Sequence, residues 1–293
     1  MRLLNRSAGR LSRYRRGPIA GFVVLLLGLL LTGGLYAAFS PAHADSDSAA
    51  AKQAQIEKGR QLFLVSCAFC HGQNGQGVLT QGGSQLGPAL TDVGAAAVDF
   101  QVGTGRMPMT MPGPQAKEKQ PSFSDQEISD LAAYVASLGT GPGIPDKQLY
   151  STQGMSQSQI NALVQRGGQI FLANCTACHN FEGSGGAMPR GGFAPRIRGV
   201  SSKHIYEAML TGPQSMDTFS DGNIPPQDKK AVIAYLNNLN NTPSYSGLTL
   251  GGLGPVSEGL IGWVVGLGFL VGFAVWIAAH TTRTTKKKDG ASA

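Results

Sequence analysis

Cys67-Ala68-Phe69-Cys70-His71 is the stretch that decides the fold, and its pattern returns at Cys175-Thr176-Ala177-Cys178-His179. These two pentapeptides hold all four cysteines of the 293-residue chain, so none remains for a disulfide framework. A C-x-x-C-H string is typical of c-type haem attachment, because two thiols three positions apart can add to the two vinyl groups of one porphyrin. The histidine that follows is then held beneath the iron. We expect two covalently bound haem c groups, attached at Cys67 and Cys70 and at Cys175 and Cys178, with His71 and His179 as axial ligands.

Other functions of a C-x-x-C pair fit the sequence less well. Two such pairs could bind one zinc ion, and one pair could form a redox site. Neither alternative explains why a histidine directly follows both pairs. We therefore favour haem over zinc.

The chain also contains an internal repeat, which extends beyond the pentapeptides. Gly59–Cys67 and Gly167–Cys175 share a glycine, a phenylalanine and the cysteine at an offset of 108 residues. Pro88 and Pro195 correspond at an offset of 107. Such self-similarity indicates two copies of one structural unit.

Each copy ends in a run with helical periodicity. Apolar residues recur at intervals of three and four over 125–138 and again over 228–239, which predicts helices that bury one face. Ser124 and Glu127 have the spacing of a capping box at the start of the first run.

Each half resembles a class I cytochrome c domain, so the expected fold is all-α with two tandem domains. In that family the first and last helices cross at a small residue beside packed aromatic rings, and a proline carbonyl orients the proximal histidine. The positions that match the crossing are Gly59, Phe63 and Tyr134 in the first half and Gly167, Phe171 and Tyr235 in the second. Pro88 and Pro195 match the proline.

Electron carriers of this kind usually have a methionine as second axial ligand, which raises the reduction potential. In the second half we choose Met216, in a loop before the last helix, over Met188, which is too near His179, and over Met209, which we expect in the core. In the first half Met107, within Gly105-Arg106-Met107-Pro108, has the spacing closest to that of Met216. Met109 and Met111 remain alternatives. We assign no ligand role to His43, His204 or His280.

The charge distribution points to a membrane and not to nucleic acid. Of the net charge of +7, residues 1–18 carry +6 and residues 280–293 carry +3, so that 19–279 is slightly acidic. Each basic end adjoins an uncharged apolar run, 19–39 or 260–279, that is long enough to span a bilayer. By the positive-inside rule both ends lie in the cytoplasm and the chain between them outside the cell membrane. Ala42-His43-Ala44 also fits a signal-peptidase site, which would leave one span.

These observations give a full domain organisation. We expect a basic segment with an anchor or cleaved signal over 1–44, cytochrome c domains over 52–139 and 161–241, linkers over 140–160 and 242–259, a transmembrane helix over 260–279 and a basic tail over 280–293.

The chain as a whole resembles the dihaem cytochrome c subunits of actinobacterial cytochrome bc complexes. The resemblance includes the order of segments and three local stretches, Phe100–Pro108, Ala208–Gln214 and Leu250–Gly259. It implies a subunit of a proton-translocating quinol–cytochrome c reductase, with a cytochrome b subunit beside it. The electrons would come from the Rieske iron–sulfur subunit and go to cytochrome c oxidase. The alternatives are the cytochrome subunit of another dehydrogenase outside the cytoplasm, or a dihaem peroxidase.

Overall fold

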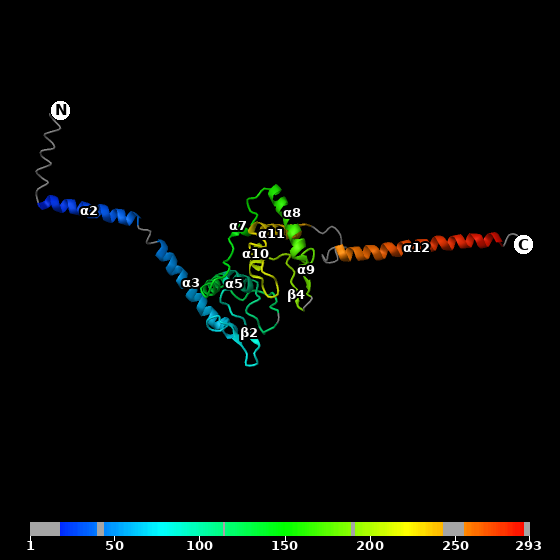
Figure 1. Cartoon of the computed structure of the whole chain (residues 1–293), viewed down its shortest axis with the longest axis horizontal. Helices are drawn as coiled ribbons and strands as arrows, with labels where there is room; N and C mark the ends of the chain where they lie inside the picture. Colours follow the sequence, from blue (N-terminus) through cyan, green and yellow to red (C-terminus); the bar gives the residue numbers. More distant parts are fainter. Residues whose placement is uncertain (1–17, 40–43, 114, 189–190, 243–254, 290–293) are drawn as a thin grey trace, which may run out of the picture. The chain divides into compact units, whose positions relative to one another are not determined.

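The protein is described by a computed structural model that covers residues 18–39, 44–113, 115–188, 191–242 and 255–289 (Figure 1). It is mostly helical, which confirms the predicted fold class. The chain divides into two compact units, residues 1–54 and 55–293.

The first haem motif lies among four helices and one short pair of strands. These elements are α3 (Ala44–Ser66), α4 (Ala68–His71), β1 (Val78–Leu79), β2 (Gln85–Gly87), α5 (Gly94–Gly103) and α6 (Asp125–Ala136). From Gln55 onward they enclose an apolar core around Phe63, Leu131 and Val135, each less than 3% exposed.

The second motif lies in a matching set of elements that follows the short helix α7 (Lys147–Tyr150). The set consists of α8 (Gln157–Asn174), α9 (Thr176–His179), β3 (Gly186–Ala187), β4 (Phe193–Ala194), α10 (Ser202–Thr211) and α11 (Pro226–Asn241). Its own core is built around Phe171, Ile233 and Leu236, whose side chains are completely buried.

The two crossing glycines lie where the helix backbones touch. A Cβ atom at Gly59 would overlap the carbonyl oxygen of Asp130 in α6, and one at Gly167 would overlap that of Ala231 in α11. Aromatic rings pack beside both crossings, with ring centroids 5.1 Å apart for Phe63 and Tyr134. The corresponding separation for Phe171 and Tyr235 is 5.4 Å. The predicted crossing is therefore confirmed in both halves.

Helix α6 begins as its sequence predicts. The Ser124 hydroxyl accepts a hydrogen bond from the backbone N–H of Glu127, and the Glu127 carboxylate accepts one from the backbone N–H of Ser124. This capping box satisfies two amide groups that the first turn of a helix leaves unpaired.

Two short antiparallel strand pairs, which the sequence pattern does not predict, complete the two domains. Val78 lies opposite Gly87 in one pair, and Gly186 lies opposite Ala194 in the other. Pro88 directly follows the first pair and Pro195 directly follows the second. Each hairpin therefore fixes the position of the proline that corresponds to the histidine-orienting proline of the cytochrome c family.

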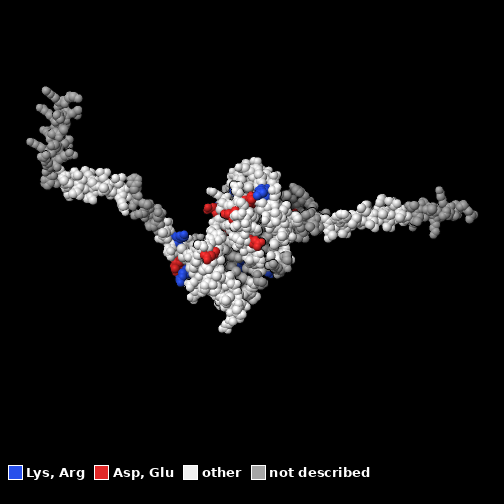
Figure 2. Space-filling view, in the orientation of Figure 1, with Lys and Arg blue, Asp and Glu red and all other residues white. Residues whose placement is uncertain are grey.

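Two helices, α2 (Pro18–Phe39) and α12 (Pro255–Asp289), contain stretches long and apolar enough to cross a membrane. These stretches are Ile19–Tyr36 and Gly259–His280, and none of their residues is buried. Figure 2 shows both as white surface without acidic or basic side chains. The side chains of the basic residues at both ends lie outside the described residues, as do Ala42 and His43 of the possible cleavage site.

Candidate haem-binding sites

Each C-x-x-C-H motif forms one short helical turn that directly follows a long helix. In the first motif the N–H groups of Cys70 and His71 both donate to the carbonyl of Cys67, at 3.1 and 3.0 Å. In the second motif Cys178 and His179 bond to Cys175 in the same way. This turn keeps both thiols and the imidazole of a motif within one turn of helix, as attachment to one porphyrin requires.

The two proximal histidines have the same fixed orientation. His71 Nδ1 lies 2.8 Å from the carbonyl oxygen of Pro88, and His179 Nδ1 lies 3.0 Å from that of Pro195. A carbonyl can only accept a hydrogen bond, so Nδ1 carries the proton and donates it. Nε2 is then left with a lone pair for a metal ion, which is the usual arrangement of a histidine ligand. The prediction that these prolines orient the histidines is confirmed.

Burial also favours the neutral imidazole at His179. Both rings belong to residues that are only 9% exposed. Burial lowers the pKa of His179, and the weaker effect of the hydrogen bond to Pro195 opposes it. A neutral ring keeps its lone pair at ordinary pH and can act as a ligand.

The four thiols are free, and three of them are half-buried whereas Cys178 is exposed. Burial raises the pKa of Cys67 to about 11 and that of Cys175 to about 12, with a further contribution from the second cysteine of each motif. Covalent haem c requires two free thiols for the bonds to the porphyrin and one imidazole for the iron, so the residues present fit this group.

The candidate methionines differ in how they contact the core. Met107 and Met216 are partly buried, and each packs against the apolar core of its own domain. Met111 is 76% exposed, and Met109 does not belong to the core. Met209 is 4% exposed inside the core, as the sequence predicts.

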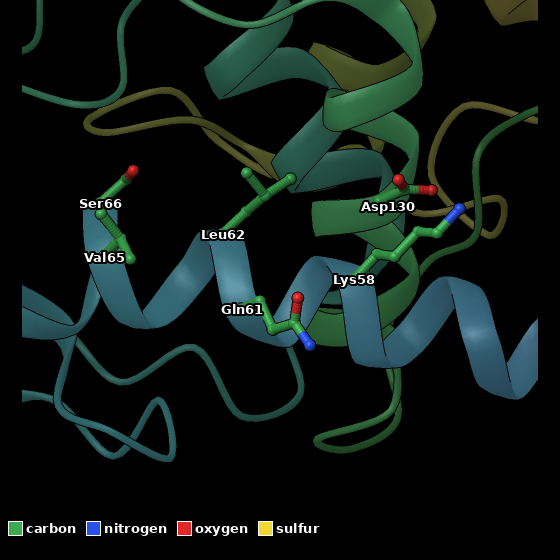
Figure 3. A pocket seen from close by; sticks show the side chains of 6 residues that line it. All are labelled: Lys58, Gln61, Leu62, Val65, Ser66 and Asp130. Carbon is green, nitrogen blue, oxygen red and sulfur yellow. The ribbon is translucent and has the colours of Figure 1, made fainter.

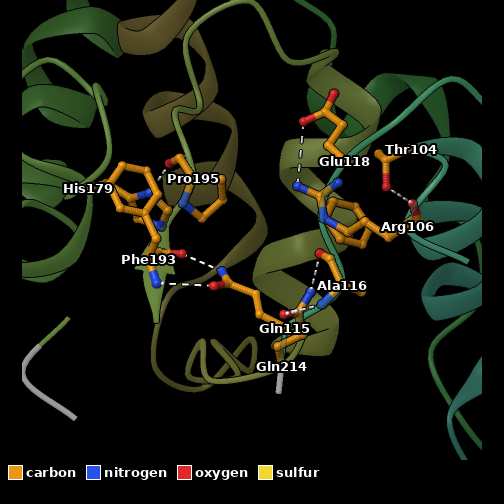
Figure 4. A network of polar contacts seen from close by, with 10 residues as sticks. Thr104, Arg106, Gln115, Ala116, Glu118, His179, Phe193, Pro195 and Gln214 are labelled. Atoms are coloured by element: carbon orange, nitrogen blue, oxygen red, sulfur yellow. Dashed lines mark hydrogen bonds and ion pairs between the residues drawn. The ribbon is translucent and has the colours of Figure 1, made fainter. Parts of the chain in front are cut away.

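Two glutamine side chains connect the first domain to the second (Figure 4). Gln214 accepts a hydrogen bond from the Ala116 N–H at 3.2 Å and donates one to the Ala116 carbonyl at 3.0 Å. The neighbouring Gln115 contacts Phe193 similarly, accepting from its N–H at 3.1 Å and donating to its carbonyl. Because Phe193 lies two residues before Pro195, this contact connects the first domain to the hairpin that positions His179.

Arg106, which directly precedes Met107, is only 7% exposed. Its guanidinium lies 4.9 Å from the centre of the Phe100 ring and 3.6 Å from the carboxylate of Glu118. Burial lowers the pKa of Arg106 and Glu118 opposes that shift. These contacts hold the residue directly before Met107 in place.

A surface pocket lies where α3 meets α6 (Figure 3). It is lined by Lys58, Gln61, Leu62, Val65, Ser66 and Asp130. None of the residues predicted to bind haem lines it, so we assign the pocket no role in electron transfer.

A buried group of polar residues that the sequence alone does not reveal lies between α5 and α10. Asp99, His204 and Glu207 bring their potential metal-binding atoms within 4.8 Å of one another. No motif marks this group, since its members come from two separate helices. The only sequence signal is an acidic residue within the apolar stretch of α5, Gly94–Gly103.

Comparison with known proteins agrees with the two repeats. The family model described as "Cytochrome c" matches residues 56–139, and that described as "Cytochrome C oxidase, cbb3-type, subunit III" matches residues 162–236. Matches to these two models imply haem c as cofactor.

Curated relatives match along nearly the whole chain. A "Cytochrome bc1 complex cytochrome c subunit" of Corynebacterium efficiens is 42% identical over 92% of this chain and 92% of its own length. The protein of the same description from Mycobacterium tuberculosis is 39% identical over 94% of this chain and 95% of its own length. Cytochrome c4 of Azotobacter vinelandii is 28% identical over 74% of this chain. The chain therefore belongs to the family of cytochrome c subunits of the cytochrome bc1 complex, and its function is electron transfer in respiration.

Proposed function

We propose that the chain carries two covalently bound haem c groups and passes electrons from the Rieske iron–sulfur subunit to cytochrome c oxidase. Cys67 and Cys70 would hold one group, and Cys175 and Cys178 the other. The observation that carries this proposal is the buried histidine of each motif, whose Nδ1–H is fixed by a proline carbonyl.

His71 and His179 would each bind iron through Nε2. Haem held in this way supplies a reversible one-electron couple. The hydrogen bonds to Pro88 and Pro195 prevent the rings from rotating and increase the basicity of Nε2. Both effects stabilise a ligand that must remain bound while the iron changes its oxidation state.

Met107 and Met216 would complete the coordination of the two iron atoms. Their packing against the core supports this choice, since a ligand needs a fixed position. The exposure of Met111 argues against it as a ligand, and Met109 remains the alternative for the first domain. A histidine and a methionine on each iron would leave no position for a substrate, which favours electron transfer over peroxidase chemistry.

The apolar helices would anchor the haem domains at the outer face of the cell membrane. The basic residues at both chain ends support a cytoplasmic location for these ends. The anchors would keep the haem domains at a high effective concentration beside membrane partners. These partners would include cytochrome b, within a proton-translocating quinol–cytochrome c reductase.

The test is to purify the tagged full-length chain from membranes with a mild detergent. We expect intact mass spectrometry to show the chain plus two haem groups, and we expect cytochrome b, the Rieske protein and oxidase subunits to accompany it. The same mass shows whether the chain is cut after Ala44.

A paired experiment tests the electron path. Replacing Cys175 and Cys178 by alanine should remove one haem, leave the other attached and stop quinol-dependent oxygen uptake. The matched replacement of Cys67 and Cys70 tests the first domain, and it should likewise remove one haem and stop quinol-dependent oxygen uptake. Unchanged oxygen uptake in either variant would show that electrons do not pass through both domains.

A further inference from the structure

The contact between α5 and α10 contains a buried carboxylate that lacks hydrogen-bond partners. Glu207 of α10 is 0% exposed. Among the described residues, neither of its carboxylate oxygens has a hydrogen-bond partner. An unpartnered buried carboxylate costs free energy, so such a group points to a bound proton or cation.

Two further groups face Glu207 and offer metal-binding atoms. Asp99 of α5 is 6% exposed, and its Oδ2 lies 3.6 Å from Nε2 of His204 in α10. The potential ligand atoms of Asp99, His204 and Glu207 all lie within 4.8 Å of one another. Ligands of a tetrahedral zinc ion lie about 3.4 Å apart, because each is about 2.1 Å from the metal. The three side chains could therefore close around an ion with shifts of about 1 Å.

The orientation of the imidazole is also fixed. The His204 ring packs edge-on against Phe100, with an interplanar angle of 90° and centroids 6.1 Å apart. The His204 side chain is 19% exposed, so an ion could reach the group from the solvent.

One bound proton would satisfy only part of the hydrogen-bonding capacity of the Glu207 carboxyl group. Burial raises the pKa of Glu207 to about 9, and the charge of Asp99 adds to the effect. A protonated Glu207 could donate one hydrogen bond to Asp99, but its second oxygen would still lack a donor. A divalent ion could bind Asp99, His204 and Glu207 together.

We propose that Asp99, His204 and Glu207 form a binding site for a divalent transition-metal ion that bridges the two cytochrome c domains. One imidazole and two carboxylates suit zinc better than calcium or magnesium, which prefer ligand sets made of oxygen alone. The ligands come from α5, within the first matched domain, and from α10, within the second. The ion would therefore stabilise the contact between the domains.

Lys203 would compete with the ion. Its ammonium lies 2.6 Å from Asp99 Oδ2, and its side chain is 34% exposed, so it can turn toward the solvent when a metal binds. Removing this positive charge should strengthen metal binding, whereas a purely structural ion pair predicts no such gain.

The experiment uses the detergent-purified complex, freed of loosely bound metal with a chelator and titrated with zinc chloride. Zinc bound per haem c is measured, together with the affinity, for the wild type, Glu207→Gln and Lys203→Met. We expect the wild type to bind one more zinc ion per chain than Glu207→Gln does. The substitution should weaken zinc binding at this site more than about 100-fold. Lys203→Met should bind zinc more tightly than the wild type.

Two controls separate metal binding from misfolding. Glu182→Gln removes a carboxylate that pairs with Arg198 at 3.0 Å elsewhere in the second domain, and it should leave zinc binding unchanged. His204→Asn removes the imidazole without touching either carboxylate and should weaken binding as Glu207→Gln does. Equal zinc binding by the wild type and Glu207→Gln, both with intact c-type absorbance spectra, would overturn the site and leave a shared proton as the explanation.

Discussion

Gln214 binds the backbone of Ala116 through both atoms of its side-chain amide, at 3.2 Å to the N–H and 3.0 Å to the carbonyl. Gln214 lies two residues before Met216, and its φ of 59° is in the left-handed region, which is costly for a residue with a side chain. The contact with Ala116 offsets part of that cost. The contact also joins the loop of Met216, the proposed iron ligand in the second domain, to a loop of the first domain.

We predict that Gln214→Ala weakens the contact between the two domains, because both backbone groups of Ala116 lose a partner. Two lost hydrogen bonds should lower the free energy of unfolding by about 1–3 kcal/mol. Hydrogen exchange at the Ala116 amide, together with denaturation followed by haem absorbance, measures the effect. Gln214→Glu keeps the acceptor and loses the donor, so its effect should be intermediate. Unchanged protection of the Ala116 amide in Gln214→Ala would contradict the prediction.

Gly167→Ala should destabilise the second domain strongly. The added methyl group would overlap the Ala231 carbonyl oxygen, which belongs to the backbone of α11 and cannot turn away. Overpacking of this kind typically costs about 1–3 kcal/mol or more. Thermal unfolding of the purified protein measures the loss. Gly222→Ala is the matched control, since its Cβ would meet only the Ser220 hydroxyl at 3.8 Å, and its melting temperature should match that of the wild type.

The features that the sequence predicted are those that recur in both domains. Gly59 and Gly167 are recognisable because the helix crossing tolerates no Cβ atom, and Pro88 and Pro195 because each follows its motif at almost the same interval. Because each position occurs in both copies, the sequence is enough to identify it.

The contacts between the copies could not be predicted in that way. Gln115 and Phe193 are 78 residues apart, and Gln214 and Ala116 are 98 residues apart. Such pairs depend on how two folded domains dock, and no periodic pattern encodes this. For the same reason the sequence does not predict the group formed by Asp99, His204 and Glu207, because its residues come from both domains.

The ion pair between Arg166 and Asp228 should make stability depend on pH in the acid range. Arg166 of α8 donates two hydrogen bonds to the Asp228 carboxylate of α11, at 2.8 and 3.1 Å, and these bonds lower the pKa of Asp228. A lowered pKa means that the stabilisation is present above the ordinary pKa of 3.8 and disappears as the pH falls through the lowered value.

Asp228→Asn should therefore be slightly less stable than the wild type at pH 7, and the difference should vanish in strong acid. Urea denaturation at a series of pH values measures it. Glu57→Gln, which breaks a longer pair of 3.9 Å with Arg60, should have a smaller effect. A difference that stays constant down to the lowest pH would exclude the ion pair as its cause.

Met107→Leu should convert the first haem to a high-spin form, because leucine has no sulfur to bind the iron. Its reduction potential should fall, since the methionine ligand raises it. Absorbance and electron paramagnetic resonance spectra of the purified complex show the change. Met111→Leu is the control, because Met111 is 76% exposed and should not contact the iron. A low-spin spectrum in Met107→Leu with a high-spin one in Met109→Leu would move the ligand to Met109.

Met216→Leu should have the same effect on the second haem while the first stays low-spin. The suitable comparison is Met209→Leu, which replaces a methionine buried in the core of the same domain. Exchanging methionine for leucine nearly conserves volume, so Met209→Leu should cost less than about 1.5 kcal/mol of stability and leave the spectrum unchanged. Met216→Leu should also change the stability of the haem-free protein little. In the haem-bound protein, unlike Met209→Leu, it should slow electron delivery. If Met209→Leu were the variant that became high-spin, the ligand assignment would move from the loop after α10 to the helix itself.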